Sequence, residues 1–256
     1  SKGEGGGSLV SNMWLGASNC VSPEVSHSAL GKRYPAFSEG TQQEFLICVL
    51  NELHAALQTV GERCGVPGTA AVRTVAETSI IAELFEGQLS YAITCLKGQT
   101  RELHRSSFAL VSLCQDCPKR FFQRDTLTRN NRTHCSRCGT KRDAAVEAAI
   151  AKAPPILVFH LKRFEGQGKH RRKLSTAICY PLSDPDLAPY SSPPPRKDAE
   201  YSLCAVVDHS GFLGDGHYAA LCKHSVTRNW YRFDDAQVTK IPSASAQTDT
   251  AYLLFY

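Results

Sequence analysis

The chain has 256 residues, 42% of them hydrophobic, and its formal net charge at pH 7 is +5. A chain of this size can bury a sizeable core as one large domain or two small ones. No apolar stretch approaches the roughly eighteen residues that a membrane span requires, and no secretion signal opens the chain. The eleven cysteines are an odd number and include two Cys-x-x-Cys pairs, which favour metal binding in a reducing compartment over a disulfide framework. We therefore expect an intracellular protein, in the cytoplasm or the nucleus, without a membrane partner.

The first half of the chain predicts one clear helix and two strand-like stretches. Residues 1–20 begin with a glycine-rich run and predict a flexible segment without fold content. Residues 41–58 predict a helix, because apolar side chains recur at helical spacing and Thr41 with Glu44 has capping-box spacing. Residues 78–96 and 106–113 alternate or run apolar, as strands do.

The second half is richer in strand signals. Residues 143–152 are alanine-rich, so their local propensity favours a helix. In the basic cluster at 169–173, a solvated turn is favoured over a nucleic-acid or nuclear-import patch. Residues 181–195, which end in three prolines, predict an exposed loop. Four aromatic and β-branched runs at hairpin spacing then predict an antiparallel sheet: Tyr201–Asp208, Tyr218–Lys223, Trp230–Asp234 and Ala251–Tyr256.

A histidine that directly follows a glycine, His217, precedes the carboxylate pair Asp234 and Asp235 by seventeen residues. A carboxylate beside a histidine fixes the imidazole tautomer and stabilises the imidazolium that forms when the ring takes a proton from a nucleophile. We predict that His217 is a general base, with Asp234 as its preferred orienter and Asp235 as the alternative. The competing interpretation is a surface histidine and a solvated turn after an aromatic strand.

Three segments resemble the ubiquitin-specific proteases, a family of cysteine deubiquitinases built from a palm, a thumb and fingers. The segment from Tyr201 to Tyr218, together with the Trp-Tyr-x-Phe-Asp-Asp run, resembles their histidine box. Pro155–Phe164 resembles their palm strand, and Ser28–Leu46 resembles part of their thumb. The resemblance implies that ubiquitin or ubiquitinated proteins are the partners, and that the reaction is hydrolysis of the bond after the C-terminal glycine of ubiquitin.

The implied fold is α+β and papain-like, with an incomplete thumb. It covers residues 21–256, with a thumb remnant at 21–60, fingers at about 90–150 and a palm formed by 75–90 and 151–256. The resemblance also implies a strand over residues 143–152, and we expect sheet pairing on both sides to override the weak helical preference there.

The nucleophile for this reaction is not evident. The segment Leu15–Cys20 echoes the family's Leu-Gly-Asn-Thr-Cys box, but it has one residue too many between glycine and cysteine. The following Val21–Glu24 contains a proline and cannot place the thiol at a helix N-terminus in the same way, and the thumb-like segment follows too soon. Buried positions as small apolar side chains are predicted for three other cysteines, Cys48, Cys204 and Cys222. We expect a chain that lacks its cysteine box and is catalytically silent; the alternative is an active deubiquitinase whose box lies outside this sequence.

Four positions match groups that bind the ubiquitin tail in the family: Glu44, His209, Gly216 and Tyr218. The family's Gly-Gly-His-Tyr is Asp-Gly-His-Tyr here, which restricts the loop over the substrate tail. The run Gln42–Phe45 is shortened and lacks the aspartate that is expected to pair with the arginine-bearing tail, a contact worth roughly 1.5–3 kcal/mol. We therefore expect weakened tail binding.

The cysteine pairs predict a zinc site. Taken alone, Cys114-x-x-Cys117 and Cys135-x-x-Cys138 fit a knuckle of four thiolates. The resemblance implies instead an earlier pair, which here reads Cys95-x-x-Gly98 and has lost one ligand. Either the fingers have lost zinc, or Cys114 or Cys117 fills the vacancy. A rival interpretation from another class, a zinc-ribbon nucleic-acid binder, leaves the histidine box unexplained, and we expect no nucleic-acid partner.

Overall fold

The structure is a computed structural model that describes residues 28, 42–57, 79–113, 117–165, 172–192, 200–212 and 215–256. It contains two compact units, Ser1–Leu84 and Phe85–Tyr256. None of the helices in the described ranges is long and apolar enough to cross a membrane.

The first unit contains the predicted helix, α3 (Gln42–Leu57), whose bounds agree with the expected 41–58. A short helix, α4 (Ile80–Phe85), follows where a strand was predicted. The reason lies in Ser79, whose hydroxyl oxygen accepts a hydrogen bond from the amide of Ala82 at 3.2 Å, as a helix N-cap does. The Ser79 hydroxyl also lies 2.6 Å from Nδ1 of His54 on α3. A local cap therefore decided the conformation of an apolar run whose pattern alone was ambiguous.

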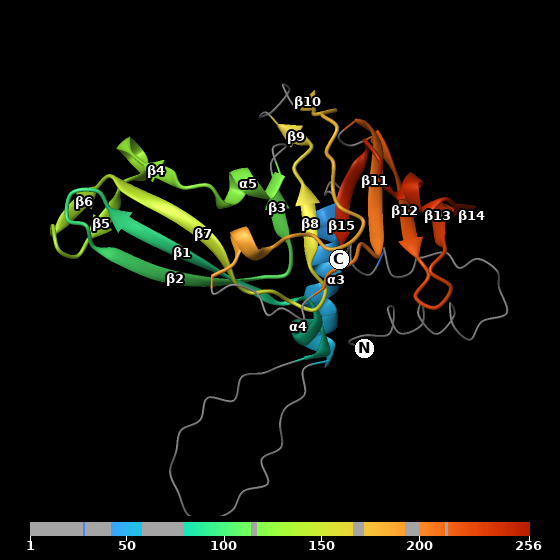
Figure 1. Ribbon diagram of the computed structural model, residues 1–256, viewed down its shortest axis with the longest axis horizontal. Helices are drawn as coiled ribbons and strands as arrows, with labels where there is room; N and C mark the ends of the chain where they lie inside the picture. The colour runs from blue at the N-terminus through green and yellow to red at the C-terminus, as the bar shows by residue number, and fades with distance from the viewer. Residues whose placement is uncertain are drawn as a thin grey trace, which may run out of the picture. The chain divides into compact units, whose positions relative to one another are not determined.

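The second unit begins with a four-stranded sheet in the order β2-β1-β7-β4 (Figure 1). Its strands are β1 (Gly87–Cys95), β2 (Arg101–Phe108), β7 (Ala144–Lys152) and β4 (Asp125–Leu127). The alanine-rich segment is thus the strand β7, paired with β1 along its length and with β4 over residues 144–146. At the end of this sheet, β5 (Thr133–Cys135) and β6 (Thr140–Arg142) form a small hairpin.

The larger sheet has seven strands in the order β14-β13-β12-β11-β15-β8-β3. They are β3 (Val111–Leu113), β8 (Val158–Leu161), β11 (Ala205–Phe212), β12 (Asp215–Lys223), β13 (Trp230–Asp234), β14 (Gln237–Ile241) and β15 (Ala251–Phe255). All four predicted aromatic runs contribute strands to it. The edge strand β14 was not predicted. Four of its five side chains are exposed, so the strand lacks the alternation of buried apolar and exposed polar positions by which a strand is recognised in a sequence.

The main hydrophobic core lies on one face of this larger sheet. Val206 pairs with both Leu221 and Leu254, and Trp230 lies two residues from Arg232, the partner of Leu221, so these apolar side chains share a face. The predicted exposed loop at 181–195 also contributes to this core, since Leu187 is buried. Short connecting elements complete the unit: α5 (Cys117–Phe122), η2 (Arg129–Asn131), β9 (Phe164–Glu165), β10 (Arg172–Lys173), η4 (Ala188–Tyr190) and η5 (Ser243–Ala246).

None of the three cysteines predicted to be buried is fully buried, and Cys48 on α3 is half-buried. Cys204 is exposed and precedes β11, and Cys222 is only half-buried on β12.

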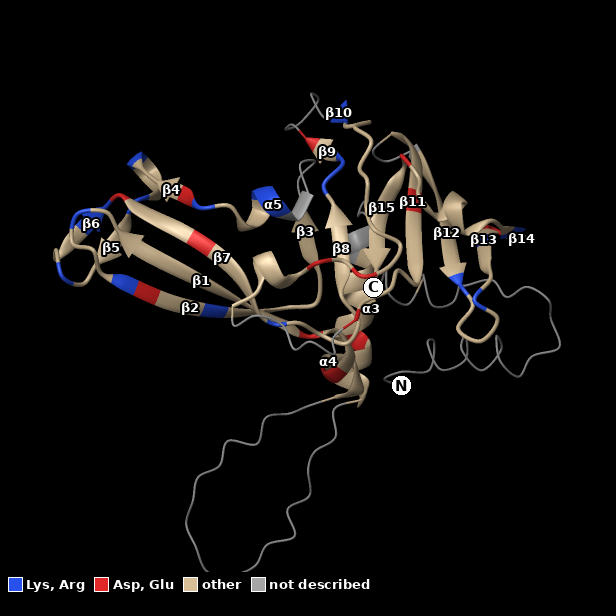
Figure 2. Cartoon of the chain, in the orientation of Figure 1, with Lys and Arg blue, Asp and Glu red and all other residues tan. Residues whose placement is uncertain are grey.

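Positive charge is unevenly distributed, because residues 97–143 carry eleven Lys and Arg against four Asp and Glu. Figure 2 shows basic residues on β2 and around the β5–β6 hairpin.

Candidate functional site

The strand register brings His217 and Asp234 together. Ala220 on β12 pairs with Phe233 on β13, so the next step along the ladder places Asp234 beside Ala219. His217 lies two residues from Ala219 and therefore on the same face, in a diagonal position that side chains can bridge. Nε2 of His217 lies 2.5 Å from Oδ1 of Asp234, with side-chain exposures of 48% and 35%.

The charges of this pair stabilise each other. The hydrogen bond and the charge of Asp234 raise the pKa of His217. The hydrogen bond from His217, followed by those from Arg232, lowers the pKa of Asp234. Nη2 of Arg232 donates to Oδ2 of Asp234 at 3.1 Å, so each carboxylate oxygen has its own cationic partner. The pair thus favours an ionised carboxylate and a protonated ring.

Asp235 occupies a different position. It lies in the two-residue loop between Asp234 and Gln237, and its φ is +49°, a left-handed conformation that aspartate tolerates better than most residues. A carboxylate oxygen of Asp235 lies within 4.8 Å of the ligand atoms of His217 and Asp234, and its charge contributes less to the raised pKa of His217. The direct hydrogen bond belongs to Asp234.

A buried carboxylate that the sequence analysis did not identify extends this network. Asp208 lies on the same face, and its Oδ2 is 3.7 Å from Nη1 of Arg232. The hydroxyl of Thr248 donates to Oδ1 of Asp208 at 2.5 Å, and burial raises the pKa of this carboxyl. The available signal was an aspartate two positions after the apolar Val206 in a strand, where the alternation predicts an inward side chain.

On the opposite face, His209 packs against the glycine that precedes His217. A β-carbon added to Gly216 would lie 2.0 Å from Nε2 of His209, so the imidazole lies directly against the glycine backbone. The ring of His209 also lies 4.5 Å from that of Tyr218 and 5.3 Å from that of Phe164. His209 is only 2% exposed, so it supports neighbouring residues more than it presents its own atoms to a ligand.

This aromatic environment keeps His209 neutral. Burial, aided by the nearby Lys173 ammonium, lowers the pKa of His209 to about 4. Nζ of Lys173 donates to the backbone carbonyl of His209 at 2.6 Å. Nδ1 of the ring has no hydrogen-bond partner among the described residues.

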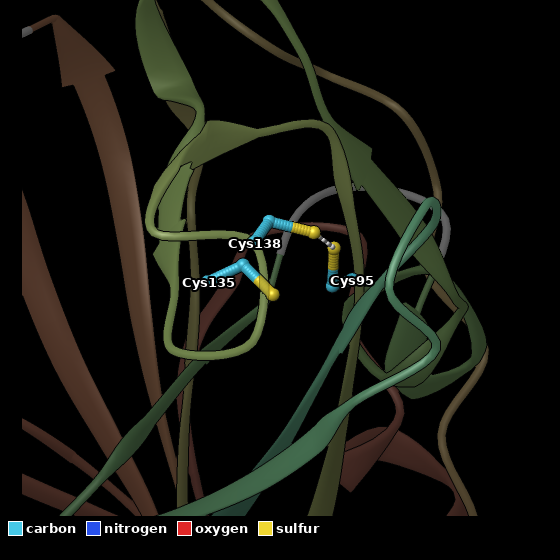
Figure 3. Close-up of side chains that lie close together, drawn as sticks. All are labelled: Cys95, Cys135 and Cys138. Carbon is cyan, nitrogen blue, oxygen red and sulfur yellow. Dashed lines mark hydrogen bonds between the residues drawn. The ribbon is translucent and has the colours of Figure 1, made fainter.

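A second cluster lies at the far end of the four-stranded sheet. Cys95, Cys135 and Cys138 place their sulfurs within 4.8 Å of one another, and the Sγ atoms of Cys95 and Cys138 are 4.0 Å apart (Figure 3). The hydroxyl of Thr100 lies 3.0 Å from Sγ of Cys135. This hydrogen bond is the main cause that lowers the pKa of Cys135 to about 6, which favours a thiolate. The three sulfurs fit a soft or borderline metal ion such as zinc.

Cys117 does not belong to this cluster. It begins α5, which packs near the other end of β7: Phe122 stacks on Tyr190 at 5.1 Å, and the adjacent Ser191 bridges to Ile150. Cys95 pairs with Ala144, and the six residues from there to Ile150 span about 20 Å of strand. A six-residue helix of about 9 Å cannot cover that distance. Cys20, Cys114 and the side chains of Glu44 and Cys117 lie outside the described residues.

With this geometry established, the family can be identified. A family model described as ubiquitin carboxyl-terminal hydrolase matches residues 6–256. Ubiquitin carboxyl-terminal hydrolase 2 of Gallus gallus is 30% identical over 278 residues, covering 97% of this chain and 77% of that protein. The chain therefore belongs to the ubiquitin carboxyl-terminal hydrolases, as a domain of the ubiquitin-specific protease type.

Solved structures agree on the fold. The SAGA Ubp8/Sgf11/Sus1/Sgf73 DUB module bound to ubiquitin aldehyde matches with a TM-score of 0.71 and 26% identity, covering 91% of this chain and 52% of that chain. The structure of the yeast SAGA DUBm with an Sgf73 mutant matches with a TM-score of 0.69 and 29% identity, covering 84% of this chain and 49% of that chain. The predicted α+β, papain-like fold is thus confirmed. The chain spans about half the length of the matched chains in these structures. Ubiquitin carboxyl-terminal hydrolase 2 of Homo sapiens is 30% identical over 97% of this chain, which corresponds to 46% of that protein.

Proposed function

We propose that this chain is a ubiquitin-binding domain that retains the base and orienter of a deubiquitinase, His217 and Asp234, but does not itself complete the hydrolysis. The contact between Nε2 and Oδ1 at 2.5 Å carries this proposal. Because Asp234 accepts the Nε2 proton, Nδ1 is the ring nitrogen that would take a proton from a thiol. Asp235 is then a neighbouring charge and not the orienter.

The cysteines of the large sheet cannot supply that thiol. Cys222 lies five residues from His217 on the same strand, so the two side chains point to opposite faces of β12. Cys204 precedes β11, whereas His217 pairs with Ser210, six residues further along and about 20 Å away. The failure of both cysteines to reach the candidate base supports the proposal of a silent domain.

The tail-binding residues of β11 and β12 are proposed to act together. Gly216 is exposed and lies between the candidate base and the ring of His209, and Tyr218 packs on that ring. His209 then shapes the strand over which the ubiquitin tail would lie, while Glu44 is proposed as a polar contact of the tail. Without the aspartate of the family's motif, we expect binding to be weak.

The decisive experiment combines an activity assay with a binding assay on the purified chain. We expect no hydrolysis of a ubiquitin–fluorophore conjugate and no labelling by a ubiquitin probe with a thiol-reactive C-terminus. Binding should be detectable with intact ubiquitin and weaker with ubiquitin that lacks its last two glycines. Equal binding of both ubiquitins, or none, would contradict the tail-binding part.

A second candidate function is a working deubiquitinase with Cys20 as nucleophile. The observation that favours it is that the family match begins at residue 6 and so includes Cys20. Probe labelling that disappears in Cys20→Ala would establish this candidate and refute the silent domain. His217→Asn would then abolish hydrolysis as well, since the thiol would lose its base.

We also propose that Cys95, Cys135 and Cys138 hold a structural zinc ion. Three sulfurs converging at the tip of two hairpin turns support this, because zinc thiolates of about 2.3 Å bond length require such an approach. Zinc would crosslink the end of β1 to the β5–β6 hairpin. Metal analysis of the purified protein tests it, with Cys135→Ser expected to lower the zinc content sharply.

A further inference from the structure

The two turns that carry the cysteine cluster have the same backbone design. In the first, the amide of Gln99 donates to the carbonyl of Cys95 at 2.9 Å, and Gln99 has a φ of +51°. In the second, the amide of Gly139 donates to the carbonyl of Cys135 at 2.9 Å, and Gly139 has a φ of +64°. Position 98 therefore corresponds to position 138, which carries a thiol.

The surroundings of Gly98 agree with this correspondence. A β-carbon built on Gly98 would lie 3.0 Å from the sulfur of Cys138, 3.3 Å from that of Cys135 and 3.5 Å from that of Cys95. A side chain at this position would thus point into the centre of the three sulfurs. The amide of Gly98 donates to Sγ of Cys95 at 3.2 Å, so its backbone already belongs to the cluster.

No described residue replaces the missing ligand. Among the described residues, the group of potential ligand atoms here contains only the three thiols. Cys117 begins a helix near the opposite end of β7, so it is excluded by distance. A zinc ion takes four ligands, and sites that keep one position for an external ligand exchange it readily.

We propose that this chain holds its metal through three thiolates and keeps the fourth coordination position, beside Gly98, open to a small external ligand such as an imidazole, a thiol or water. This rests on the proposed zinc site and adds to it. Nη1 of Arg137 donates to the carbonyl of Gly98 at 3.2 Å, which places a positive charge near that position and favours an anionic ligand. Three thiolates also suit soft ions such as Cu(I).

The test uses the full chain loaded with Co²⁺, whose visible absorption reports the ligand set, and compares it with two variants. Gly98→Cys supplies the fourth thiolate, and Gly98→Ala adds the same β-carbon without a ligand, which controls for crowding. Added imidazole or 2-mercaptoethanol should shift the spectrum of the original chain and leave Gly98→Cys unchanged. Gly98→Cys should also retain zinc against a chelator at least about 10-fold better, equivalent to roughly 1.4 kcal/mol.

Each other result has a defined meaning. A chain that binds metal with a spectrum insensitive to added ligands would overturn the open position and leave the zinc proposal standing. A loss of affinity in Cys114→Ser or Cys117→Ser as large as in Cys135→Ser would identify an internal fourth ligand and also overturn it. Absence of metal under all loading conditions would refute the zinc proposal itself.

Discussion

A methyl group on Gly216 would lie 2.0 Å from Nε2 of the buried His209, a distance at which one of the two groups must move. We predict that Gly216→Ala destabilises the fold by about 1–3 kcal/mol, the usual cost of overpacking a filled site. Chemical unfolding of the variant and of the original chain measures this loss of stability. In a His209→Ala background the same change should cost much less, because the clashing ring is gone; additive effects would show that the two residues do not interact.

The raised pKa of His217 can be observed without any enzymatic activity. The ring should titrate above 6.5 in an NMR pH series, and Asp234→Asn should lower its pKa, since the first cause of the shift is removed. Asp235→Asn should lower the pKa less, because that charge is a smaller contributor. If Asp235→Asn lowered the pKa of His217 more than Asp234→Asn does, Asp235 would be the main partner of the ring. The His217→Gln variant identifies which NMR signal belongs to His217.

Sequence reasoning identified the pair His217 and Asp234 but not its support. The pair was predicted from its spacing, its residue types and the surrounding segment that resembles the histidine box, and a hairpin brings such positions onto neighbouring strands. The roles of Asp208 and Arg232 depend on register across β11, β12 and β13, and that register is set by tertiary pairing. The same limit explains Cys117, whose spacing fits a zinc knuckle although the topology separates it from Cys135.

Among the elements, β7 shows tertiary pairing overriding local propensity. Its alanines favour a helix, yet β1 pairs with it throughout and β4 pairs with one end. The opposite case is α4, where the side chain of Ser79 caps a helix in an apolar run that was predicted to be extended. One element was decided by long-range pairing and the other by a single local hydrogen bond.

A pair of matched substitutions tests this account of β7. Ala148 faces Tyr91 across the ladder, so Ala148→Thr should stabilise the fold by a few tenths to about 1 kcal/mol through β propensity and cross-strand contact. Ala55 is exposed on α3, and Ala55→Thr should destabilise by about 0.5 kcal/mol. Opposite signs in chemical unfolding are expected. Destabilisation of similar size by both would mean that the pairing of β7 does not favour a β-branched residue.

At the scale of the whole molecule, two buried histidines make folding sensitive to acid. His160 and His209 are 4% and 2% exposed. Burial is the main cause that lowers the pKa of each to about 4. In the unfolded chain both titrate near 6.5, so between pH 6.5 and 4 the unfolded state binds more protons than the folded state. Stability is therefore lost as pH falls through this window, by at most roughly 1.4 kcal/mol per pH unit for each histidine.

Two other groups have the opposite effect, because the stability that they contribute falls as pH rises. The raised pKa of His217 adds stability that is fully present below about pH 6.5. This stability is lost as the pH rises through the pKa that His217 has in the folded protein. The raised pKa of the buried Asp208 carboxyl gives stability that declines with increasing pH, beginning near its unfolded value of about 3.9. The interval from pH 5 to 6.5 lies below the unfolded pKa of both buried histidines and above their folded value of about 4, so it is the range in which their effect is measured.

We predict that urea unfolding gives a lower free energy of unfolding at pH 5 than at pH 6.5, and that His160→Asn reduces the difference. The amide side chain can keep the 3.0 Å hydrogen bond that Ser112 makes with Nδ1 of His160, while it removes the titrating ring. The informative quantity is the slope of stability against pH, since the variant also changes packing against Tyr252, whose ring lies 4.8 Å away. An unchanged slope in His160→Asn would show that folding does not lower the pKa of His160, and that another group causes the acid sensitivity.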